Sequence, residues 1–217
     1  MKSVAQYANF HSNVDSNSPK LAASLLTDSL QEHLKTVQAL LDSTLEDIER
    51  SGQMICDALA AGRKILLCGN GGSAADAQHI AAELVGCYER QRRSWPAIAL
   101  TTDTSALTAV SNDLGYEQVF ARQIAGLAQA GDVLIAISTS GRSKNVLQAV
   151  ERAREIGCRT IALTGASSDP LGPMCDMTVA VPASRTSRIQ EAHITIGHLW
   201  CEMVDQIESQ KDTGDRE

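Results

Sequence analysis

Five short apolar runs, separated by stretches long enough to form helices, constrain the fold of this 217-residue chain more than any other feature. The runs are apolar almost throughout, which is typical of strands buried on both faces of a parallel sheet. Helix-length segments between such strands predict an α/β fold with helices on both faces. We therefore expect a three-layer α/β/α sandwich whose five parallel strands lie at residues 65–68, 97–100, 133–137, 160–163 and 177–181.

Two amphipathic helices are expected ahead of the first strand. Between residues 20 and 42, apolar side chains recur every three to five positions, as on one face of a helix. Ser43 followed by Glu46 is a capping-box signature, and it predicts a second helix that ends near Gly62. Apolar stripes on such helices favour packing on the main domain or on a partner subunit. The chain then divides into a polar N-terminal arm (1–19), N-terminal helices (20–62), the α/β domain (63–208) and a polar tail (209–217).

Composition and charge exclude several classes of protein. With 43% apolar and 21% charged residues, the chain has a globular composition, and no apolar run approaches the roughly 20 residues that cross a bilayer. The N-terminus lacks the apolar stretch of a signal peptide, so we expect a cytoplasmic protein. A net charge of −7 disfavours nucleic acid or an anionic membrane as partner. The six cysteines form no C-x-x-C pair and are expected to be reduced and buried.

Residues rich in glycine and hydroxyl groups follow the expected strands, at the edge where open parallel sheets bind ligands. Residues 69–73 read Gly-Asn-Gly-Gly-Ser, and residues 138–143 read Ser-Thr-Ser-Gly-Arg-Ser. The hydroxyls of the second loop can donate to phosphate oxygens, and the helix after it points free amides at the anion. An ordinary turn with Ser143 as helix cap would explain one hydroxyl but not four in six residues. The second loop therefore predicts a phosphate site.

His79 and Glu83 lie one helical turn apart on the helix that is expected after the first loop. An exposed pair of this kind is usually a surface contact worth a few tenths of a kcal/mol. Here the neighbours are nearly all Ala or Ile, so we expect a largely buried helix, in which a carboxylate needs a partner or a function.

A last helix, expected to begin near Thr186, carries a second set of polar side chains. Gln190 and His198 are two turns apart on it and can face the same cavity. The sequence leaves the role of His193 open.

The segment 69–74 also fits the dinucleotide fingerprint G-x-G-x-x-A. That fingerprint is followed by an acidic residue about 20 positions further on, at the end of the second strand. Here Asp103 lies about 30 positions on, and the helix that would pack beneath a pyrophosphate carries His79 and Glu83. A nicotinamide or flavin enzyme is therefore disfavoured.

Five segments carry a specific likeness when taken together: Cys-Gly-Asn-Gly-Gly-Ser-Ala-Ala-Asp-Ala-Gln-His (68–79), Ala-Ala-Glu-Leu-Val-Gly (81–86), Ala-Leu-Thr-Thr-Asp-Thr-Ser (99–105), Ser-Thr-Ser-Gly-Arg-Ser (138–143) and Arg-Ile-Gln-Glu-Ala-His (188–193). On these segments the chain resembles the bacterial phosphoheptose isomerases, which are sedoheptulose 7-phosphate isomerases of the SIS (sugar isomerase) domain superfamily. The resemblance covers roughly residues 25–205. It implies a flavodoxin-like sheet, a homotetramer with active sites between subunits, and the first step toward the nucleotide-activated heptose of bacterial lipopolysaccharide.

The resemblance also implies roles for particular residues. The phosphate pocket corresponds to Ser138, Thr139, Ser140 and Ser143. Other substrate contacts correspond to Asn70, Gly71, Gly72, Ser73, Asn112, Asp113 and Gln190. The family's zinc positions correspond to His79, Glu83, Gln190 and His198, so Zn²⁺ is the implied cofactor. Glu83 and His198 also match the family's acid/base pair.

Two non-enzymatic alternatives belong to the same superfamily. One is an adaptor that binds a replication initiator, and proteins of that kind depart from the isomerase pattern at the glutamate and the last histidine. The other is a sugar-phosphate sensor, which would keep the serine loop without needing a proton-transfer pair. This chain keeps Glu83, Gln190 and His198, which favours the isomerase.

Overall fold

A computed structural model of the chain describes residues 18–214. The chain forms two compact units, Met1–Lys35 and Thr36–Glu217. Helix α1 (Ser18–Ser43) begins in the first unit and ends in the second. In the first unit, α1 exposes four leucine side chains, Leu25, Leu26, Leu30 and Leu34. The expected polar arm and tail lie mostly outside the described residues.

A five-stranded sheet forms the centre of the second unit. All neighbouring pairs run parallel, in the order β2-β1-β3-β4-β5. This is the strand order of flavodoxin-like folds, and it confirms the expected fold class. The strands are β1 (Ile65–Cys68), β2 (Ala97–Ala99), β3 (Val133–Ser138), β4 (Arg159–Thr164) and β5 (Met177–Ala180).

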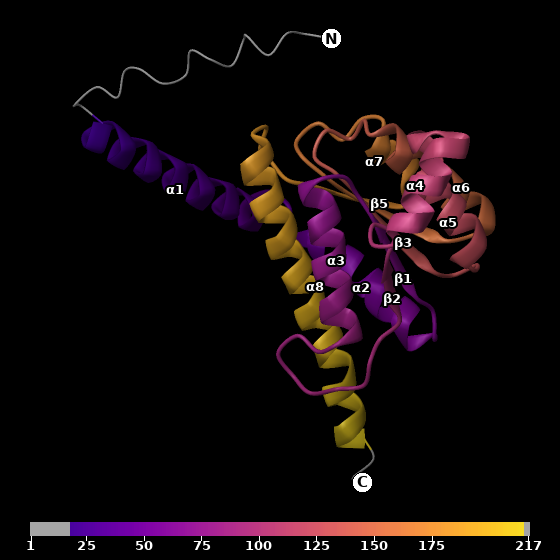
Figure 1. Cartoon of the computed structure of the whole chain (residues 1–217). Helices are drawn as coiled ribbons and strands as arrows, with labels where there is room; N and C mark the ends of the chain where they lie inside the picture. Colours follow the sequence, from indigo (N-terminus) through magenta and orange to yellow (C-terminus); the bar gives the residue numbers. More distant parts are fainter. Residues whose placement is uncertain (1–17, 215–217) are drawn as a thin grey trace. The chain divides into compact units, whose positions relative to one another are not determined.

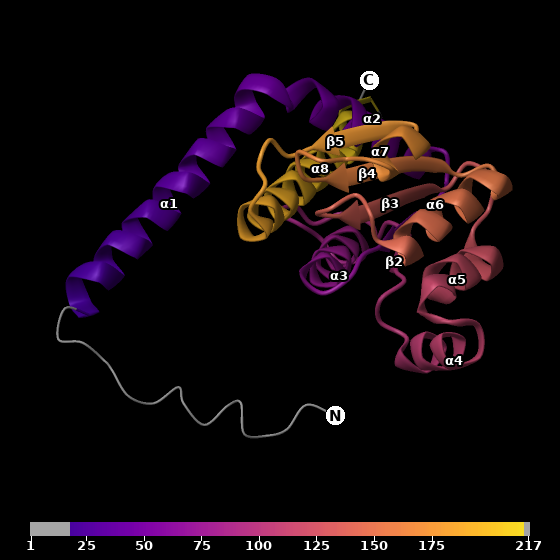
Figure 2. The same cartoon turned by 90° about the horizontal axis from the view of Figure 1, so that it is seen from above.

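Helices cover both faces of this sheet, as Figures 1 and 2 show. One face packs against α2 (Leu45–Ala60), α3 (Gly72–Val85) and α8 (Thr186–Gly214). The other packs against α4 (Thr104–Leu114), α5 (Val119–Leu127) and α6 (Lys144–Ile156), with the short elements η2 (Tyr116–Gln118) and α7 (Leu171–Met174) beside them. β1, β3 and most of β4 are fully buried between these layers, which is why their sequences are continuously apolar.

Both tryptophans of the chain are buried. The indole N–H of Trp200 on α8 donates to the Ile48 carbonyl oxygen and to Ser51 Oγ on α2, each at 3.1 Å. Trp95, in the segment before β2, lies beneath the guanidinium of Arg93, whose central carbon is 3.8 Å from the ring centroid. The two hydrogen bonds of Trp200 fix α8 against α2.

The capping-box prediction was wrong. Ser43 is the last residue of α1, and its hydroxyl donates to the Ala39 carbonyl oxygen at 2.8 Å. Thr44 holds the N-cap position of α2 without a side-chain capping bond. The two helices follow each other with one residue between them, and the Thr44 N–H donates to the Leu40 carbonyl oxygen at 3.0 Å. The predicted stop is confirmed: Gly62, at φ +74°, follows the end of α2.

The expected burial of the cysteines is only partly confirmed. All six thiols are free, and four of them are buried. Cys175 is half-buried and Cys87 is exposed, because Cys87 lies just beyond the end of α3 rather than in a core element. No helix in the described part of the chain is long and apolar enough to span a bilayer.

Candidate active site

A reciprocal amide pair joins the glycine loop to the start of α6. Asn70 Nδ2 donates to Asn145 Oδ1 at 2.9 Å, and Asn145 Nδ2 donates to Asn70 Oδ1 at 2.8 Å. The Tyr116 hydroxyl donates to the same Asn70 oxygen at 3.0 Å. β1 and β3 are neighbours, so their carboxyl ends bring both loops to one edge of the sheet. The sequence reading missed Asn145 and Tyr116, since neither belongs to a recognisable motif.

The serine loop is built around a contact between two hydroxyls. Ser138 Oγ and Ser143 Oγ are 3.1 Å apart, and the Arg142 N–H donates to Ser140 Oγ at 3.3 Å. Ser143 occupies the N-cap position of α6 but makes no side-chain capping bond. Simple helix capping therefore does not account for Ser143. Its hydroxyl faces Ser138 at the N-terminus of a 13-residue helix, where anions bind favourably.

Glycine is required in the middle of this loop. Gly141 has φ +66°, and a Cβ atom there would lie 2.6 Å from the Ser168 carbonyl oxygen. The loop is thus packed tightly against the segment that follows β4. A pocket of about 300 Å³ opens beside it, lined by Thr139, Ser140, Arg142, Ala166, Ser167, Ala183, Ser184, Thr186 and Ile189. This volume is at the lower end of the range for small-molecule sites.

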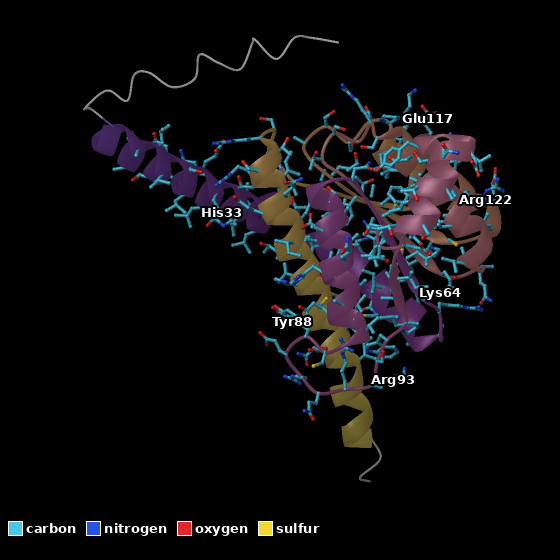
Figure 3. All side chains as sticks on the ribbon, viewed as in Figure 1. His33, Lys64, Tyr88, Arg93, Glu117 and Arg122 are labelled. Atoms are coloured by element: carbon cyan, nitrogen blue, oxygen red, sulfur yellow. The ribbon has the colours of Figure 1, made fainter. Side chains whose placement is uncertain are left out.

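Histidines from α3 and α8 meet directly. His79 Nε2 and His198 Nε2 are 2.9 Å apart, with ring centroids separated by 5.1 Å. Glu83 Oε1 lies 3.4 Å from the same His79 nitrogen. The ring of Tyr88, labelled in Figure 3, is also close to His198, with ring centroids 5.3 Å apart. Two imidazoles in such contact share a proton when neutral, because one nitrogen must donate and the other accept.

The expectation that this face of α3 is buried was wrong. The His79 side chain is 48% exposed and that of Glu83 is 24% exposed. The residues of α3 that pack into the core lie on its other face: Ser73, Ala77, Ile80, Ala81 and Leu84. The sequence was misleading because alanine also occupies exposed positions of this helix, at Ala75 and Ala82.

Gln190 approaches α3 at a different point from His198. A Cβ atom on Gly72 would lie only 2.7 Å from Gln190 Cδ, so the Gln190 side chain lies over the first residue of the helix. His198 meets His79 seven positions further along, about two helical turns away. In the described part of the chain, no three His, Cys, Asp or Glu side chains converge closely enough to hold a metal ion. The structure thus joins His79, Glu83 and His198, and places Gln190 beside the glycine loop.

Asp76 is a candidate residue that the sequence reading missed. Asp76 lies three residues before His79 on α3. Its Oδ2 atom is buried without a hydrogen-bond partner among the described residues. Burial raises the pKa of this carboxyl to about 6, although the nearby His79 lowers it. The available signal was an acidic residue among alanines on the same helix as His79 and Glu83.

Asn112 and Asp113 are exposed near the end of α4. The Asn112 amide donates to Asp113 Oδ1 at 2.8 Å. Their expected contacts with substrate stay predictions.

Arg92 and Asp205 hold α3 and α8 together beyond the histidines. Arg92 Nε donates to Asp205 Oδ1 at 2.6 Å, and the two side chains are 2% and 3% exposed. The same guanidinium donates to the carbonyl oxygens of Glu83 at 2.8 Å and Leu84 at 2.9 Å, at the end of α3. This ion pair fixes the backbone that carries Glu83.

The fold and the site together define the class. The chain combines a parallel sheet in flavodoxin-like order, a hydroxyl-rich loop at its carboxyl edge and an imidazole–carboxylate group on α3 and α8. The sequence model of the SIS domain matches residues 28–165.

Individual relatives narrow the class. A phosphoheptose isomerase from a Nitratiruptor species is 55% identical over 177 residues, which is 82% of this chain and 95% of the relative. The solved phosphoheptose isomerase GmhA from Neisseria gonorrhoeae is 42% identical, with a TM-score of 0.81 over 85% of this chain and 99% of that one. The solved phosphoheptose isomerase from Francisella tularensis is 36% identical, with a TM-score of 0.83 over 85% of this chain and 98% of that one. The chain belongs to the phosphoheptose isomerases of the SIS domain family.

Proposed function

We propose that this protein is an aldose–ketose isomerase that converts sedoheptulose 7-phosphate to D-glycero-D-manno-heptose 7-phosphate. The observation that carries the proposal is the meeting of His79 and Glu83 on α3 with His198 on α8, in a chain with a hydroxyl-rich anion loop. Relatives about half identical to this chain bear the name phosphoheptose isomerase. The product is the first intermediate toward the heptose of bacterial lipopolysaccharide, as the resemblance implies.

The reaction moves a carbonyl group from C2 to C1 through an enediol. Glu83 acts as the base that removes a proton from C1, and His198 as the acid that protonates the C2 carbonyl oxygen. Return of a proton to C2, with loss of the proton from the C1 hydroxyl, completes the aldose. His79 contacts both residues and orients them for these two transfers.

The serine loop holds the phosphate in this proposal. Ser138, Thr139, Ser140 and Ser143 supply hydroxyl donors, and the N-terminus of α6 supplies amides and a favourable dipole. The adjoining pocket of about 300 Å³ leaves room for part of the sugar chain. A phosphate fixed there holds the reacting carbons in one place, which lowers the entropic part of the barrier.

We also propose a zinc ion as cofactor. Two imidazoles whose Nε2 atoms are 2.9 Å apart, with a carboxylate oxygen 3.4 Å from one of them, are a donor set that suits zinc. His79, Glu83 and His198 would hold the ion once their side chains move closer together, and Gln190, which lies over Gly72 in this structure, would join them only by moving along α3. When bound, zinc would polarise the carbonyl and enediol oxygens as a Lewis acid.

A homotetramer with active sites between subunits, located in the cytoplasm, completes the proposal. The exposed leucines of α1, with side chains 61–67% exposed, support association because lone subunits rarely keep such a stripe in water.

The first experiment measures aldose formation from sedoheptulose 7-phosphate by protein treated with a chelator, with and without added zinc. Mass spectrometry gives the zinc content of the same samples, and the absorption of a cobalt-substituted sample reports the ligand set. Turnover that rises with the zinc content supports both the isomerase activity and zinc as its cofactor. Turnover without metal supports the isomerase and rejects zinc. Tight binding of the sugar phosphate without turnover in either sample would favour a sensor.

A further inference from the structure

A second, larger pocket lies at the opposite end of the sheet from the loops described above. Its volume is about 510 Å³. Gly131 just before β3, Arg159 at the first residue of β4 and Met177 at the first residue of β5 contribute to its lining. Because all five strands run parallel, these positions mark the amino edge of the sheet. The other lining residues are Arg63 and, on or just after α2, Arg50, Gln53, Met54, Asp57, Ala58 and Ala61.

The charges around this pocket are strongly unbalanced. Three arginines and one aspartate line it, in a chain whose net charge is −7. The Asp57 carboxylate accepts a hydrogen bond from the Gln53 amide at 2.7 Å. A neutral amide does not cancel the carboxylate charge, but the lining still carries more positive than negative charge. A concentration of positive charge on an acidic protein indicates a local preference for anions.

The arginines of the pocket have few partners of their own. Among the described residues, Arg50 and Arg63 make no ion pair and no side-chain hydrogen bond. Arg159 Nε is 3.9 Å from Asp176 Oδ2, an oxygen that already accepts from the Thr160 N–H at 2.7 Å. By contrast, Lys64, labelled in Figure 3, is paired with the buried Asp132 at 2.6 Å. Donors on the pocket arginines remain available to a ligand.

The glycine at position 131 lets the Arg63 side chain lie close to the backbone just before β3. Gly131 has φ +88°, and a Cβ atom there would lie 3.1 Å from Arg63 Nε. The Arg63 guanidinium therefore lies against bare backbone at the start of β3. The rest of the floor is apolar and comes from Met54, Ala58, Ala61 and Met177.

We propose that this pocket binds a nucleoside diphosphate. Guanidinium groups form paired hydrogen bonds with phosphate oxygens, and three of them match the charge of a diphosphate. The apolar floor provides a surface for the base, and Gln53, whose amide nitrogen donates to Asp57, provides its amide oxygen for a polar group of the nucleoside. The volume lies within the range of small-molecule sites. The pocket is separate from the chemistry at the carboxyl edge, so this inference does not depend on the proposed isomerase.

The test is calorimetric titration of the full-length protein with three probes. ADP carries both parts of the proposed ligand, pyrophosphate lacks the nucleoside, and adenosine lacks the phosphates. We expect saturable binding of ADP that is at least about tenfold tighter than that of either fragment. Equal binding of ADP and pyrophosphate would remove the nucleoside from the proposal, and absence of saturable ADP binding would overturn it.

Arginine variants assign the binding to this pocket. Arg63→Gln and Arg50→Gln should each weaken ADP binding by roughly tenfold, because each removes a charge-assisted contact. Arg122→Gln is the matched control, since Arg122 is an exposed residue of α5 outside the pocket and is labelled in Figure 3. ADP binding that both pocket variants leave unchanged would place the ligand elsewhere, for instance at the serine loop, and would reject the proposal.

Discussion

His193 shows how burial sets the charge of a single side chain. It is fully buried on α8, and its Nε2 lies 3.0 Å from the Thr164 carbonyl oxygen at the end of β4. Because a carbonyl only accepts, the neutral ring must carry its proton on Nε2. Burial lowers the pKa of this imidazole to about 4. His193 therefore acts as a neutral link between α8 and the sheet, which resolves the role that the sequence left open.

The lowered pKa of His193 makes stability depend on pH. Below the ordinary pKa of 6.5, the unfolded chain takes up a proton that the folded chain excludes until about pH 4. The free energy of unfolding therefore falls by up to about 3 kcal/mol as the pH drops through this window. His193→Gln keeps a donor for Thr164 but does not titrate.

Urea unfolding at pH 7.5 and pH 4.5 measures the effect. Wild type should lose more stability than the variant on acidification, by an amount approaching this figure. An equal loss in both proteins would show that His193 titrates normally.

Glu83 is the residue on which the proposed chemistry depends most. Glu83→Gln keeps the size of the side chain but removes the base, so turnover should fall by about 10²–10⁴-fold. Binding of sedoheptulose 7-phosphate should change little, because the serine loop is the proposed phosphate site. Steady-state kinetics and calorimetry separate the two quantities.

Glu151→Gln, at an exposed position of α6, is the control for this substitution. A Glu83→Gln enzyme with near-normal turnover would exclude Glu83 as the base.

At the scale of elements, the ion pair between Arg92 and Asp205 joins the two helices of the site. The pair is almost completely buried, so loss of one partner leaves a charge without compensation. Asp205→Asn should lower the free energy of unfolding by about 3–5 kcal/mol. The exposed Glu202→Gln on the same helix should have little effect.

A double substitution, Arg92→Met with Asp205→Leu, tests the reason for that loss. Replacing both charges by apolar groups should recover much of the stability in urea unfolding, because no isolated charge remains. If the double variant is no more stable than Asp205→Asn, the hydrogen bonds of Arg92 to the end of α3 matter more than the unpaired charge.

The sequence predicted the elements well wherever burial is symmetrical. Each of the five apolar runs is a strand in the structure, with ends that differ from the prediction by at most one residue. β1, β3 and most of β4 are covered on both faces and so have no polar side, which lets their extent be read directly from the apolar run; the edge strands β2 and β5 are partly exposed. The capping box failed because Ser43 found its partner inside α1, which local spacing does not reveal.

The sequence singled out residues of the candidate site but not their spatial arrangement. Spacing placed His79 and Glu83 on one helix face, and the structure confirms their contact. The Asn70–Asn145 pair joins residues 75 positions apart, and Arg92 and Asp205 are 113 apart. Such partners depend on how helices pack on the sheet. The exposure of His79 could not be predicted from the sequence either, because the alanines around it are compatible with both core and surface.

At the scale of the whole molecule, the stripe on α1 predicts an assembly. Leu26, Leu30 and Leu34 recur every four residues and stay exposed in the first unit. Leu26→Asp with Leu30→Asp should convert the proposed tetramer to smaller species, because charges would be buried at the contact. Light scattering coupled to gel filtration gives the mass.

Ser24→Asp with Gln31→Asp, about 100–120° around the same helix from Leu30, is the control for this pair of substitutions. An unchanged mass in the leucine variant would show that α1 is not part of the interface.

The two buried tryptophans lie in different regions, so their fluorescence can follow the unfolding of each region separately. Trp200 senses the packing of α8 on α2, and Trp95 senses the segment that leads into β2. Both indoles are shielded from water, so each should emit at short wavelength until its own region opens. Replacing either ring by phenylalanine leaves a single emitter. Fluorescence of the two single-tryptophan proteins would then show whether the site helices and the sheet edge separate together or in sequence.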